Sequence, residues 1–425
     1  MKILRSEFSK GVAWLTSGTA AIQLLTIVFS PIITRLYLPE ELGVFALYSS
    51  FLGVLLILGT LKYENSIPIS SSNRMALNAL MVSVFCLVFF SVFIAVFSWL
   101  VGDSILFWLD AEVLIKYKYL LPIGLFFSGS YLIVIQWGLR QKMFKKITQT
   151  KITQGVGMNF AQAGLGFLSF GSVGLIVGHI IGKSAGVFTL FRDLYTNFKD
   201  ELKSVSIKRM RWTLYRFRKF PIFTMPAQLL STLGIELPVF FITAFYGSDV
   251  VGQYALAHMI VGLPVTLIGT AVGDVFYAEA AQNGKSNPKA LLRLTNKILK
   301  PLFFVGLIPM LVIVLFGPFL FPFVFGDNWI DAGEFAQIIT IVAFARLLFT
   351  PVFWVFIVFE KHITYLLINV MRVAMVLISF LLVYFFDVNA FYAVAFYSTS
   401  MALVYLITYF MARNLMLKEI VLKEK

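Results

Sequence analysis

The chain has 425 residues, of which 59% are hydrophobic and 13% are charged, and its mean hydropathy is +0.88. This balance excludes a soluble globular protein. The net charge of +14 would suit nucleic-acid binding in a soluble protein, but in a membrane protein lysine and arginine gather in cytoplasmic loops. Because Cys86 is the one cysteine, the sequence excludes an internal disulfide and a thiolate metal cluster.

Twelve apolar stretches of the sequence are long enough to cross a membrane, since a spanning helix needs about 20 residues. The first stretch follows basic residues, but it is too long for a signal peptide and lacks a small-residue cleavage site, so we expect a span. Little chain remains for a soluble domain. The predicted spans cover residues 11–34, 42–62, 76–101, 118–138, 149–170, 172–193, 221–245, 251–277, 301–325, 334–358, 364–386 and 389–412.

The basic residues predict the side of the membrane on which each loop lies. Of the 35 lysines and arginines, 29 are counted with the two termini and the loops on that side, including residues at the adjoining span ends such as Lys151. Only Arg35, Lys116 and, at the start of the fourth span, Lys118 are counted with the opposite side. The positive-inside rule therefore predicts a multi-pass protein with both termini in the cytoplasm.

An internal repeat divides the chain near its middle. The pattern Y-x-x-[ED]-x-[LV]-G-x-[FY]-A-L occurs at residues 37–47 and again, without a gap, at 246–256. Both copies join an odd-numbered predicted span to the next even one, so the repeat predicts two parallel six-helix lobes, an architecture of transporters. The predicted domains are an N-terminal lobe of residues 1–193, a basic cytoplasmic linker of residues 194–219 and a C-terminal lobe of residues 220–425.

Ionisable residues inside the predicted spans are the strongest sign of function, because a charge at membrane depth costs about 2.5–3.5 kcal/mol and needs a cavity or a partner. Lys183, Arg346 and Arg372 lie within spans and would together attract an anion, and the arginine fork suits phosphate oxygens. Glu236 is a carboxylate in the seventh span. An interhelical ion pair between Glu236 and either arginine is the alternative interpretation.

Two polar stripes accompany these charges. Asn159 and Gln162 share one helical face of the fifth span with two glycines, which predicts either close helix packing or hydrogen bonds to sugar hydroxyls. In the eleventh span Asn369 shares a face with Tyr365 and Arg372. This second group favours a sugar-phosphate surface.

The sequence offers no signature of an enzyme. His179, His258 and His362 are widely separated, and none belongs to a motif for acyl transfer or zinc hydrolysis. No glycine-rich loop carries a phosphate-binding lysine, so ATP is not expected as a direct energy source. We therefore predict a protein that is not an enzyme and that binds neither a metal nor another cofactor.

The segment around the first repeat copy resembles a known family. It reads P-I-I-T-R-L-Y-L-P-E over residues 31–40, L-G-V-F-A-L-Y over 42–48 and L-K-Y-E-N-S-I-P over 61–68. These motifs are similar to the N-terminal signature of polysaccharide flippases, the Wzx-type branch of the MOP exporter superfamily. Family members often carry arginine where this chain has Lys62, which keeps the charge but not the bidentate geometry. The resemblance implies a MATE-like all-α fold.

The same resemblance implies a bacterial inner-membrane protein that moves an undecaprenyl-pyrophosphate-linked oligosaccharide repeat unit from the cytoplasmic to the periplasmic leaflet, for O-antigen or capsule synthesis. A polysaccharide polymerase and chain-length machinery are the implied protein partners. We expect alternating access, with coupling to a proton or sodium gradient or to the membrane potential. Substrate binding is assigned to Arg346, Arg372, Lys183, Asn159, Gln162 and Asn369.

Gating or coupling is assigned to two pairs at opposite ends of the first hairpin, Arg35 with Glu40 and Lys62 with Glu64, and to Glu236. Three other classes of protein are the alternatives. A cation-coupled drug antiporter of the same superfamily would be expected to centre its cavity on carboxylates, and a membrane enzyme of glycan assembly lacks its motifs. A lipid II flippase is expected to have further C-terminal spans.

Overall fold

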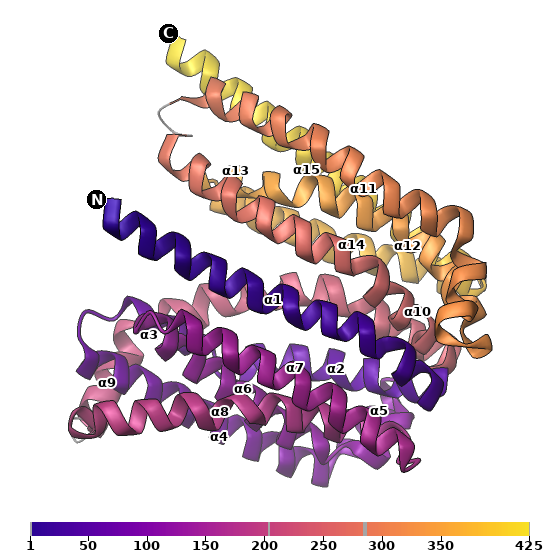
Figure 1. Ribbon diagram of the computed structural model, residues 1–425, viewed down its shortest axis with the longest axis horizontal. Helices are drawn as coiled ribbons and strands as arrows, with labels where there is room; N and C mark the ends of the chain where they lie inside the picture. The colour runs from indigo at the N-terminus through magenta and orange to yellow at the C-terminus, as the bar shows by residue number, and fades with distance from the viewer. Residues whose placement is uncertain (1, 203–204, 284–286, 425) are drawn as a thin grey trace. The chain divides into compact units, whose positions relative to one another are not determined.

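The computed structural model describes residues 2–202, 205–283 and 287–424 (Figure 1). Over these residues the chain forms helices joined by short turns, with no β-strand. In a bilayer a helix satisfies all its backbone hydrogen bonds within its own segment, so apolar stretches of this length fold as helices. The predicted all-α membrane fold is confirmed.

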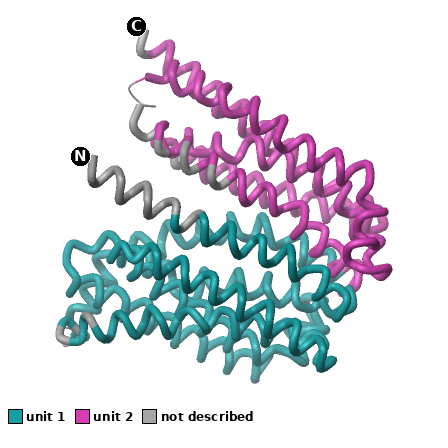
Figure 2. The backbone as a smooth tube through the Cα atoms, in the orientation of Figure 1, with its two compact units in different colours: residues 1–244 teal, residues 245–425 magenta. Residues whose placement is uncertain are grey.

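Two compact units divide the chain, residues 1–244 and residues 245–425 (Figure 2). The helices of the first unit are α1 Lys2–Leu36, α2 Pro39–Gly59, α3 Ser66–Ile69, α4 Asn73–Leu100, α5 Gly102–Trp108, α6 Leu120–Arg140, α7 Phe144–Phe167, α8 Ser172–Leu202 and α9 Ile207–Arg216. Helix α10, Met225–Asn283, begins in the first unit and ends in the second. The second unit continues with α11 Pro288–Phe325, α12 Ile330–Phe349, α13 Trp354–Val358, α14 His362–Phe386 and α15 Ala390–Glu424.

Short helical turns connect several of these helices. Those of the first unit are the 3₁₀ turns Tyr63–Asn65 and Glu112–Tyr117 and the π-helical turn Phe220–Thr224, which leads into α10. Those of the second unit are the 3₁₀ turns Asp327–Trp329 and Thr350–Phe353. The long helices therefore follow one another with little irregular chain between them.

The boundary between the compact units lies later in the chain than the repeat suggested. Residues 220–244, assigned above to the C-terminal lobe, belong to the first unit because their side chains pack on α2. The rings of Phe51 and Phe240 meet edge to face with centroids 4.7 Å apart, and Ser50 hydrogen-bonds Glu236. The division into lobes of residues 1–193 and 220–425 stays a prediction.

Ten helices in the described part of the chain are long and apolar enough to cross a membrane, so the protein is a multi-pass membrane protein. The seventh predicted span and residues 251–269 of the eighth fall in one apolar segment, Phe220–Gly269. Within it the backbone leaves the helical conformation at Gly247. Helix α7 covers the fifth predicted span but is too polar to be among the ten. The count of twelve spans stays a prediction.

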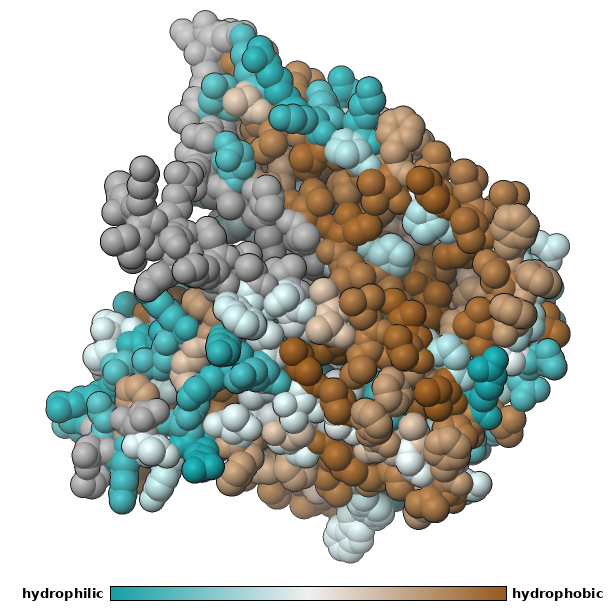
Figure 3. Space-filling model, viewed as in Figure 1, coloured by the Kyte–Doolittle hydropathy of each residue, from teal (hydrophilic) through white to brown (hydrophobic). Residues whose placement is uncertain are grey.

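The hydrophobic surface and the hydrophilic helix ends of the first unit are visible in Figure 3, where hydrophilic residues gather at the end that carries α3 and α9. On α4, Phe85, Phe89 and Phe93 are about half exposed or more. Spaced four residues apart, they form one stripe along the helix. In a bilayer this stripe faces lipid, whereas Leu80 and Leu87 of the same helix are buried in the core.

Candidate functional site

The turn after α2 holds the first group of predicted site residues. Leu61 and Lys62 have φ angles of 50° and 60°, a left-handed conformation that costs energy in residues other than glycine. This turn brings Lys62 Nζ to 3.5 Å from Glu64 Oε1, and the side chains are 15% and 3% exposed. The second carboxylate oxygen, Glu64 Oε2, is buried and has no hydrogen-bond partner among the described residues.

Contacts from α9 and α6 hold this turn and the short helix α3 that follows it. The Tyr63 hydroxyl donates to the Leu214 carbonyl of α9 at 3.2 Å, and burial raises the pKa of that hydroxyl. On the other side Arg140 of α6 donates through one nitrogen, Nη1, to the carbonyls of Ile67, Pro68 and Ser70. Arg140 thus supplies a donor to carbonyls at the end of α3, where a helix leaves carbonyls unsatisfied, and it shares the Ile67 carbonyl with the Ser70 N–H.

The other predicted gate pair does not form an ion pair. Arg35 lies in the last turn of α1 and Glu40 in the first turn of α2, and both side chains are exposed. Glu41, the neighbouring carboxylate, accepts a hydrogen bond from the Leu38 backbone N–H at 2.9 Å. This end of the first hairpin is therefore held by a helix cap rather than by the predicted pair.

Glu236 lies on the part of α10 that belongs to the first unit. Its Oε2 accepts a hydrogen bond from Ser50 Oγ of α2 at 2.7 Å. Neither Arg346 nor Arg372 forms an ion pair anywhere in the described part of the chain. The alternative interpretation of these arginines as partners of Glu236 stays a prediction.

Lys183 of α8 is half-buried in the first unit, and its ammonium group forms neither an ion pair nor a hydrogen bond among the described residues. Its close electrostatic neighbours are His179, one turn earlier on α8, and Lys151 of α7. Lys151, counted above among the loop residues, is half-buried and donates to Thr19 Oγ1 of α1 at 3.3 Å. Among the described residues neither lysine forms an ion pair, so these two neighbouring cations favour an anion.

The polar stripe of α7 contributes to helix packing. Asn159 and Gln162 are 3% and 5% exposed. Asn159 Nδ2 donates to the Gly155 carbonyl on the same helix, and Gln162 Nε2 donates to the Leu175 carbonyl of α8 at 2.9 Å. Their amide N–H groups are therefore already engaged within the protein. Sugar binding by these two residues stays a prediction.

Arg372 is the buried cation of the second unit. On α14 it is 9% exposed, its Nη2 donates to the Tyr405 hydroxyl of α15 at 2.9 Å, and its guanidinium lies 5.3 Å from the centroid of the same ring. Its Nε is buried without a partner among the described residues. Asn369, one turn earlier, donates to the Tyr365 carbonyl. Arg372 therefore has one donor that the described part of the chain does not satisfy.

Arg346 of α12 belongs to the same group of residues. It is half-buried, and it lies within electrostatic range of His258 on α10 and Tyr397 on α15. Arg372 also lies within range of Tyr397. The ring of Tyr254, which stacks on His258 with centroids 5.8 Å apart, belongs to the second repeat copy.

This group, Tyr254, His258, Arg346, Arg372, Tyr397 and Tyr405, is called the arginine cluster below. Sequence reasoning found its two arginines but missed its tyrosines and His258. Only the position of Tyr254 in the repeat could have pointed to one of them. Two guanidinium groups with aromatic and imidazole neighbours, and with no carboxylate among the contacts described, can bind an anionic group that also presents an apolar or sugar face.

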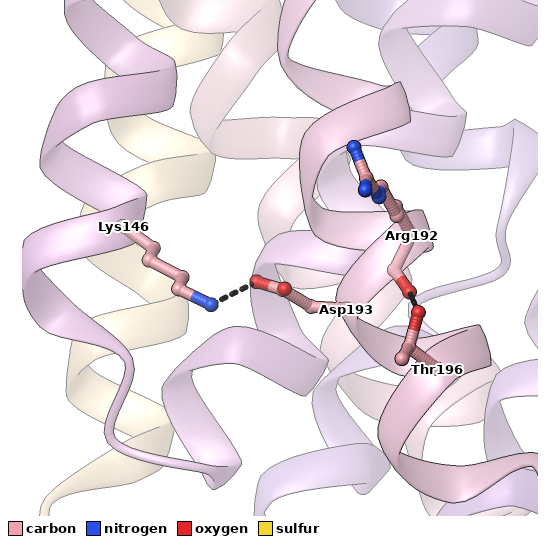
Figure 4. Close-up of polar contacts among 4 residues, drawn as sticks. All are labelled: Lys146, Arg192, Asp193 and Thr196. Carbon is pink, nitrogen blue, oxygen red and sulfur yellow. Dashed lines mark hydrogen bonds and ion pairs between the residues drawn. The ribbon is translucent and has the colours of Figure 1, made fainter.

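A separate ion pair joins the start of α7 to α8 (Figure 4). Lys146 Nζ lies 2.6 Å from Asp193 Oδ2, with the lysine side chain 47% exposed. The backbone carbonyl of Arg192, the residue before Asp193, accepts a hydrogen bond from the Thr196 hydroxyl. These contacts hold helix ends together and involve none of the predicted site residues.

Comparison with solved structures establishes the fold. An inward-facing multidrug resistance MATE family transporter of the MOP superfamily matches with a TM-score of 0.72 and 15% identity, over 93% of this chain and 95% of that chain. The lipid II flippase MurJ in an inward closed conformation matches with a TM-score of 0.68 and 14% identity, over 93% of this chain and 87% of that one. At such identities the likeness shows the fold alone.

Comparison of sequences identifies the family. The teichuronic acid biosynthesis protein TuaB of Bacillus subtilis (strain 168) is 28% identical over 139 residues, which are 32% of this chain and only 28% of that protein's length. Residues 32–334 match the family described as polysaccharide biosynthesis protein. The resemblance stated from residues 31–68 is thus confirmed, and the chain belongs to the polysaccharide biosynthesis protein family, with the fold of the MOP superfamily.

Proposed function

We propose that this protein translocates an undecaprenyl-pyrophosphate-linked oligosaccharide repeat unit from the cytoplasmic to the periplasmic leaflet of a bacterial inner membrane, by alternating access. The family membership supports a role in polysaccharide biosynthesis. In this proposal the translocated repeat unit is used for O-antigen or capsule assembly, where a polymerase with its chain-length machinery receives it. Both termini of the protein lie in the cytoplasm. The protein is a transporter and not an enzyme.

The arginine cluster carries the proposal. A pyrophosphate group has oxygens that match a guanidinium fork, and attached sugars present faces that pack on tyrosine rings. Arg372 has one nitrogen bound to Tyr405 and a buried Nε without a partner among the described residues. Arg346 lies within electrostatic range of His258 and Tyr397 and forms no ion pair in the described part of the chain. An anionic headgroup would supply the negative charge that these contacts lack.

Lys183 and Lys151 give the first unit a second cationic position of the same kind. We assign both to the path of the anionic headgroup, while the lipid tail stays in the bilayer. Glu236 is the carboxylate that we assign to coupling with a proton or sodium gradient. The Lys62–Glu64 pair is assigned to gating, because its turn has left-handed backbone and a buried carboxylate oxygen without a partner among the described residues, and such strain is concentrated at switch regions.

Deletion of the gene in its native host tests the proposal directly. We expect loss of surface polysaccharide, accumulation of complete lipid-linked repeat units on the cytoplasmic side, and rescue by the intact gene. Accumulation of lipid II instead would identify the alternative lipid II flippase. Unchanged glycan and unchanged lipid-linked pools, in a strain without a redundant transporter, would overturn the proposal and favour the cation-coupled antiporter.

Two substitutions then test the arginine cluster. Arg346→Ala and Arg372→Lys should leave protein abundance near normal but reduce surface polysaccharide at least about tenfold, because a phosphate contact in a buried site contributes more than about 1.4 kcal/mol. Arg293→Ala, at an exposed arginine of α11, is the matched control and should transport normally. Loss of abundance together with activity would assign the arginines to packing.

A further inference from the structure

Helix α9, which lies between α8 and α10 in the chain, has two unlike faces. Its inner face packs on α4 and on the turn after α2: Thr213 is 1% exposed, and Met210 and Leu214 contact a core cluster that contains Tyr63, Val82 and Phe217. Ser206 caps its first turn by accepting from the Arg209 N–H. The inner face therefore has its partner within the protein.

The outer face of α9 combines positive charge with exposed aromatic rings. Residues 207–219 contain six lysines and arginines and no acidic residue. Ile207, Trp212 and Tyr215 are 80%, 55% and 66% exposed, and the guanidinium of Arg218 lies 4.2 Å from the centroid of the Tyr215 ring. The basic side chains at positions 208, 211 and 216 are exposed as well.

The position of α9 places this face at the membrane surface. The turn that follows it begins at Phe220, the first residue of the apolar segment Phe220–Gly269. Figure 1 shows α9 at the end of the first unit that also carries α3, and Figure 3 shows hydrophilic residues gathered there. A helix at this level with lysine, arginine, tryptophan and tyrosine on one face matches the chemistry of headgroups above an acyl boundary.

We propose that the outer face of α9 binds acidic phospholipid headgroups, and that this contact anchors the turn carrying Lys62 and Glu64. Basic residues near an acidic membrane surface each contribute about fivefold to binding. The link to the turn is direct, because the Tyr63 hydroxyl donates to the Leu214 carbonyl of α9 and Tyr63 packs with Phe217. The inference does not depend on which substrate the protein moves.

Trp212 provides the reporter for the test. The full-length protein is reconstituted in nanodiscs of phosphatidylcholine with phosphatidylglycerol, with one lipid at a time brominated on its acyl chains. Quenching of Trp212, obtained as the difference between the parent protein and Trp212→Phe, measures the local proportion of each lipid. We expect brominated phosphatidylglycerol to quench Trp212 well above its bulk mole fraction.

A triple variant and a charge-matched control separate a specific site from general attraction. Lys208→Gln with Arg211→Gln and Arg216→Gln should lower the affinity for phosphatidylglycerol by about a hundredfold at full contact, and so return its proportion around Trp212 close to the bulk mole fraction. Arg293→Gln with Arg413→Gln and Lys418→Gln removes the same charge from exposed positions elsewhere and should preserve the enrichment. Raised salt should lower the enrichment in the parent protein, which tests the inference even if the α9 variant fails to fold.

Hydrogen exchange of residues 60–66 tests the second half of the proposal. The parent protein and the control should exchange these amides more slowly in discs with phosphatidylglycerol than without it, and the α9 variant should show no difference. Enrichment without this protection would overturn the link to the turn. A proportion of phosphatidylglycerol around Trp212 equal to the bulk value in every variant would overturn lipid binding and direct attention to an acidic protein partner.

Discussion

The two copies of the internal repeat share an anchoring tyrosine but differ in how the helix is interrupted beside it. In the first copy the Tyr37 hydroxyl donates to the Gln162 carbonyl at 2.7 Å, and in the second the Tyr246 hydroxyl donates to the Val388 carbonyl. Each tyrosine thus ties the end of one helix to a distant carbonyl of its own compact unit. The residue that follows each tyrosine differs, and so does the break in the helix.

In the first copy Leu38 is extended, Pro39 starts α2, and Glu41 caps the new helix. In the second copy Gly247 breaks α10 with φ 85° and ψ 178°, a conformation that essentially only glycine adopts. The comparison teaches that the motif specifies an anchoring tyrosine, while its next residue decides the geometry of the break. Four measurements test this interpretation.

Replacement of Gly247 should have the largest effect. Gly247→Ala is expected to lower the free energy of unfolding by about 1–3 kcal/mol, and because no atom would lie within 4 Å of the added Cβ, the cause would be backbone conformation alone. The apparent melting temperature of the purified protein in detergent measures the effect. Gly262→Ala, which has the same open surroundings without a positive φ, should be neutral or stabilising by up to about 1 kcal/mol. Equal losses in both variants would contradict the argument.

Removal of an anchoring tyrosine hydroxyl should have the next largest effect on stability. Tyr37→Phe should cost about 1–2 kcal/mol of unfolding free energy, because it leaves the buried Gln162 carbonyl without its donor. Tyr246→Phe should cost less, since Tyr246 is only half-buried whereas Tyr37 is 3% exposed. Melting of the two variants side by side decides the order. A larger loss for Tyr246→Phe would mean that the second anchor matters more than its burial suggests.

The pH dependence of the first anchor follows from the same burial. Burial, with a smaller contribution from Glu41, raises the pKa of the Tyr37 hydroxyl to about 12, whereas an unfolded tyrosine ionises near pH 10. The neutral hydroxyl therefore stabilises the fold below about pH 10, and this contribution is lost as the pH rises towards 12. Melting temperatures across that range should fall more steeply in the parent protein than in Tyr37→Phe. Equal slopes of melting temperature against pH in the two proteins would refute the assignment of this pH dependence to Tyr37.

Removal of the Glu41 cap in the first copy should have the smallest effect on the free energy of unfolding. Glu41→Ala is expected to cost about 0.5–1 kcal/mol, because it removes the acceptor of the Leu38 N–H and a negative charge from the first turn of α2. Glu41→Gln keeps an acceptor and should recover part of the loss. The second copy has Val250 at the equivalent position, so Val250→Ala should change stability little. Comparable losses at both positions would remove the distinction between the copies.

Much of the fold could be predicted from the sequence because it depends on the bilayer. Long apolar stretches must be helical in lipid, and the repeat and the motif of residues 31–68 pointed to the family. Neighbours in sequence were also predictable, as the Lys62–Glu64 contact shows. The unit boundary was not, because it depends on Phe240 and Glu236 packing against α2.

Only the two arginines of the arginine cluster could be predicted from the sequence, because the rest of the cluster depends on packing. Charge at membrane depth singles out Arg346 and Arg372 in the sequence, since it is costly there. Tyr254, Tyr397 and His258 carry no such cost and are common inside helices, so only packing reveals that they surround the arginines. Lys151 was assigned to a loop because it stands at the start of a polar helix, and its nearness to Lys183 appears only in three dimensions.

The three carbonyls held by the Arg140 guanidinium have a practical consequence for spectroscopy. They tie the segment between α3 and α4 to α6, while the exposed Ser72 is the N-cap of α4 and accepts a hydrogen bond from the Met75 N–H. A spin label introduced at Ser71, in a chain whose Cys86 has been replaced, would therefore report the joined ends of α4 and α6. Distances measured from that label should be assigned to these two helices, and a probe for α2 belongs instead on α2 itself.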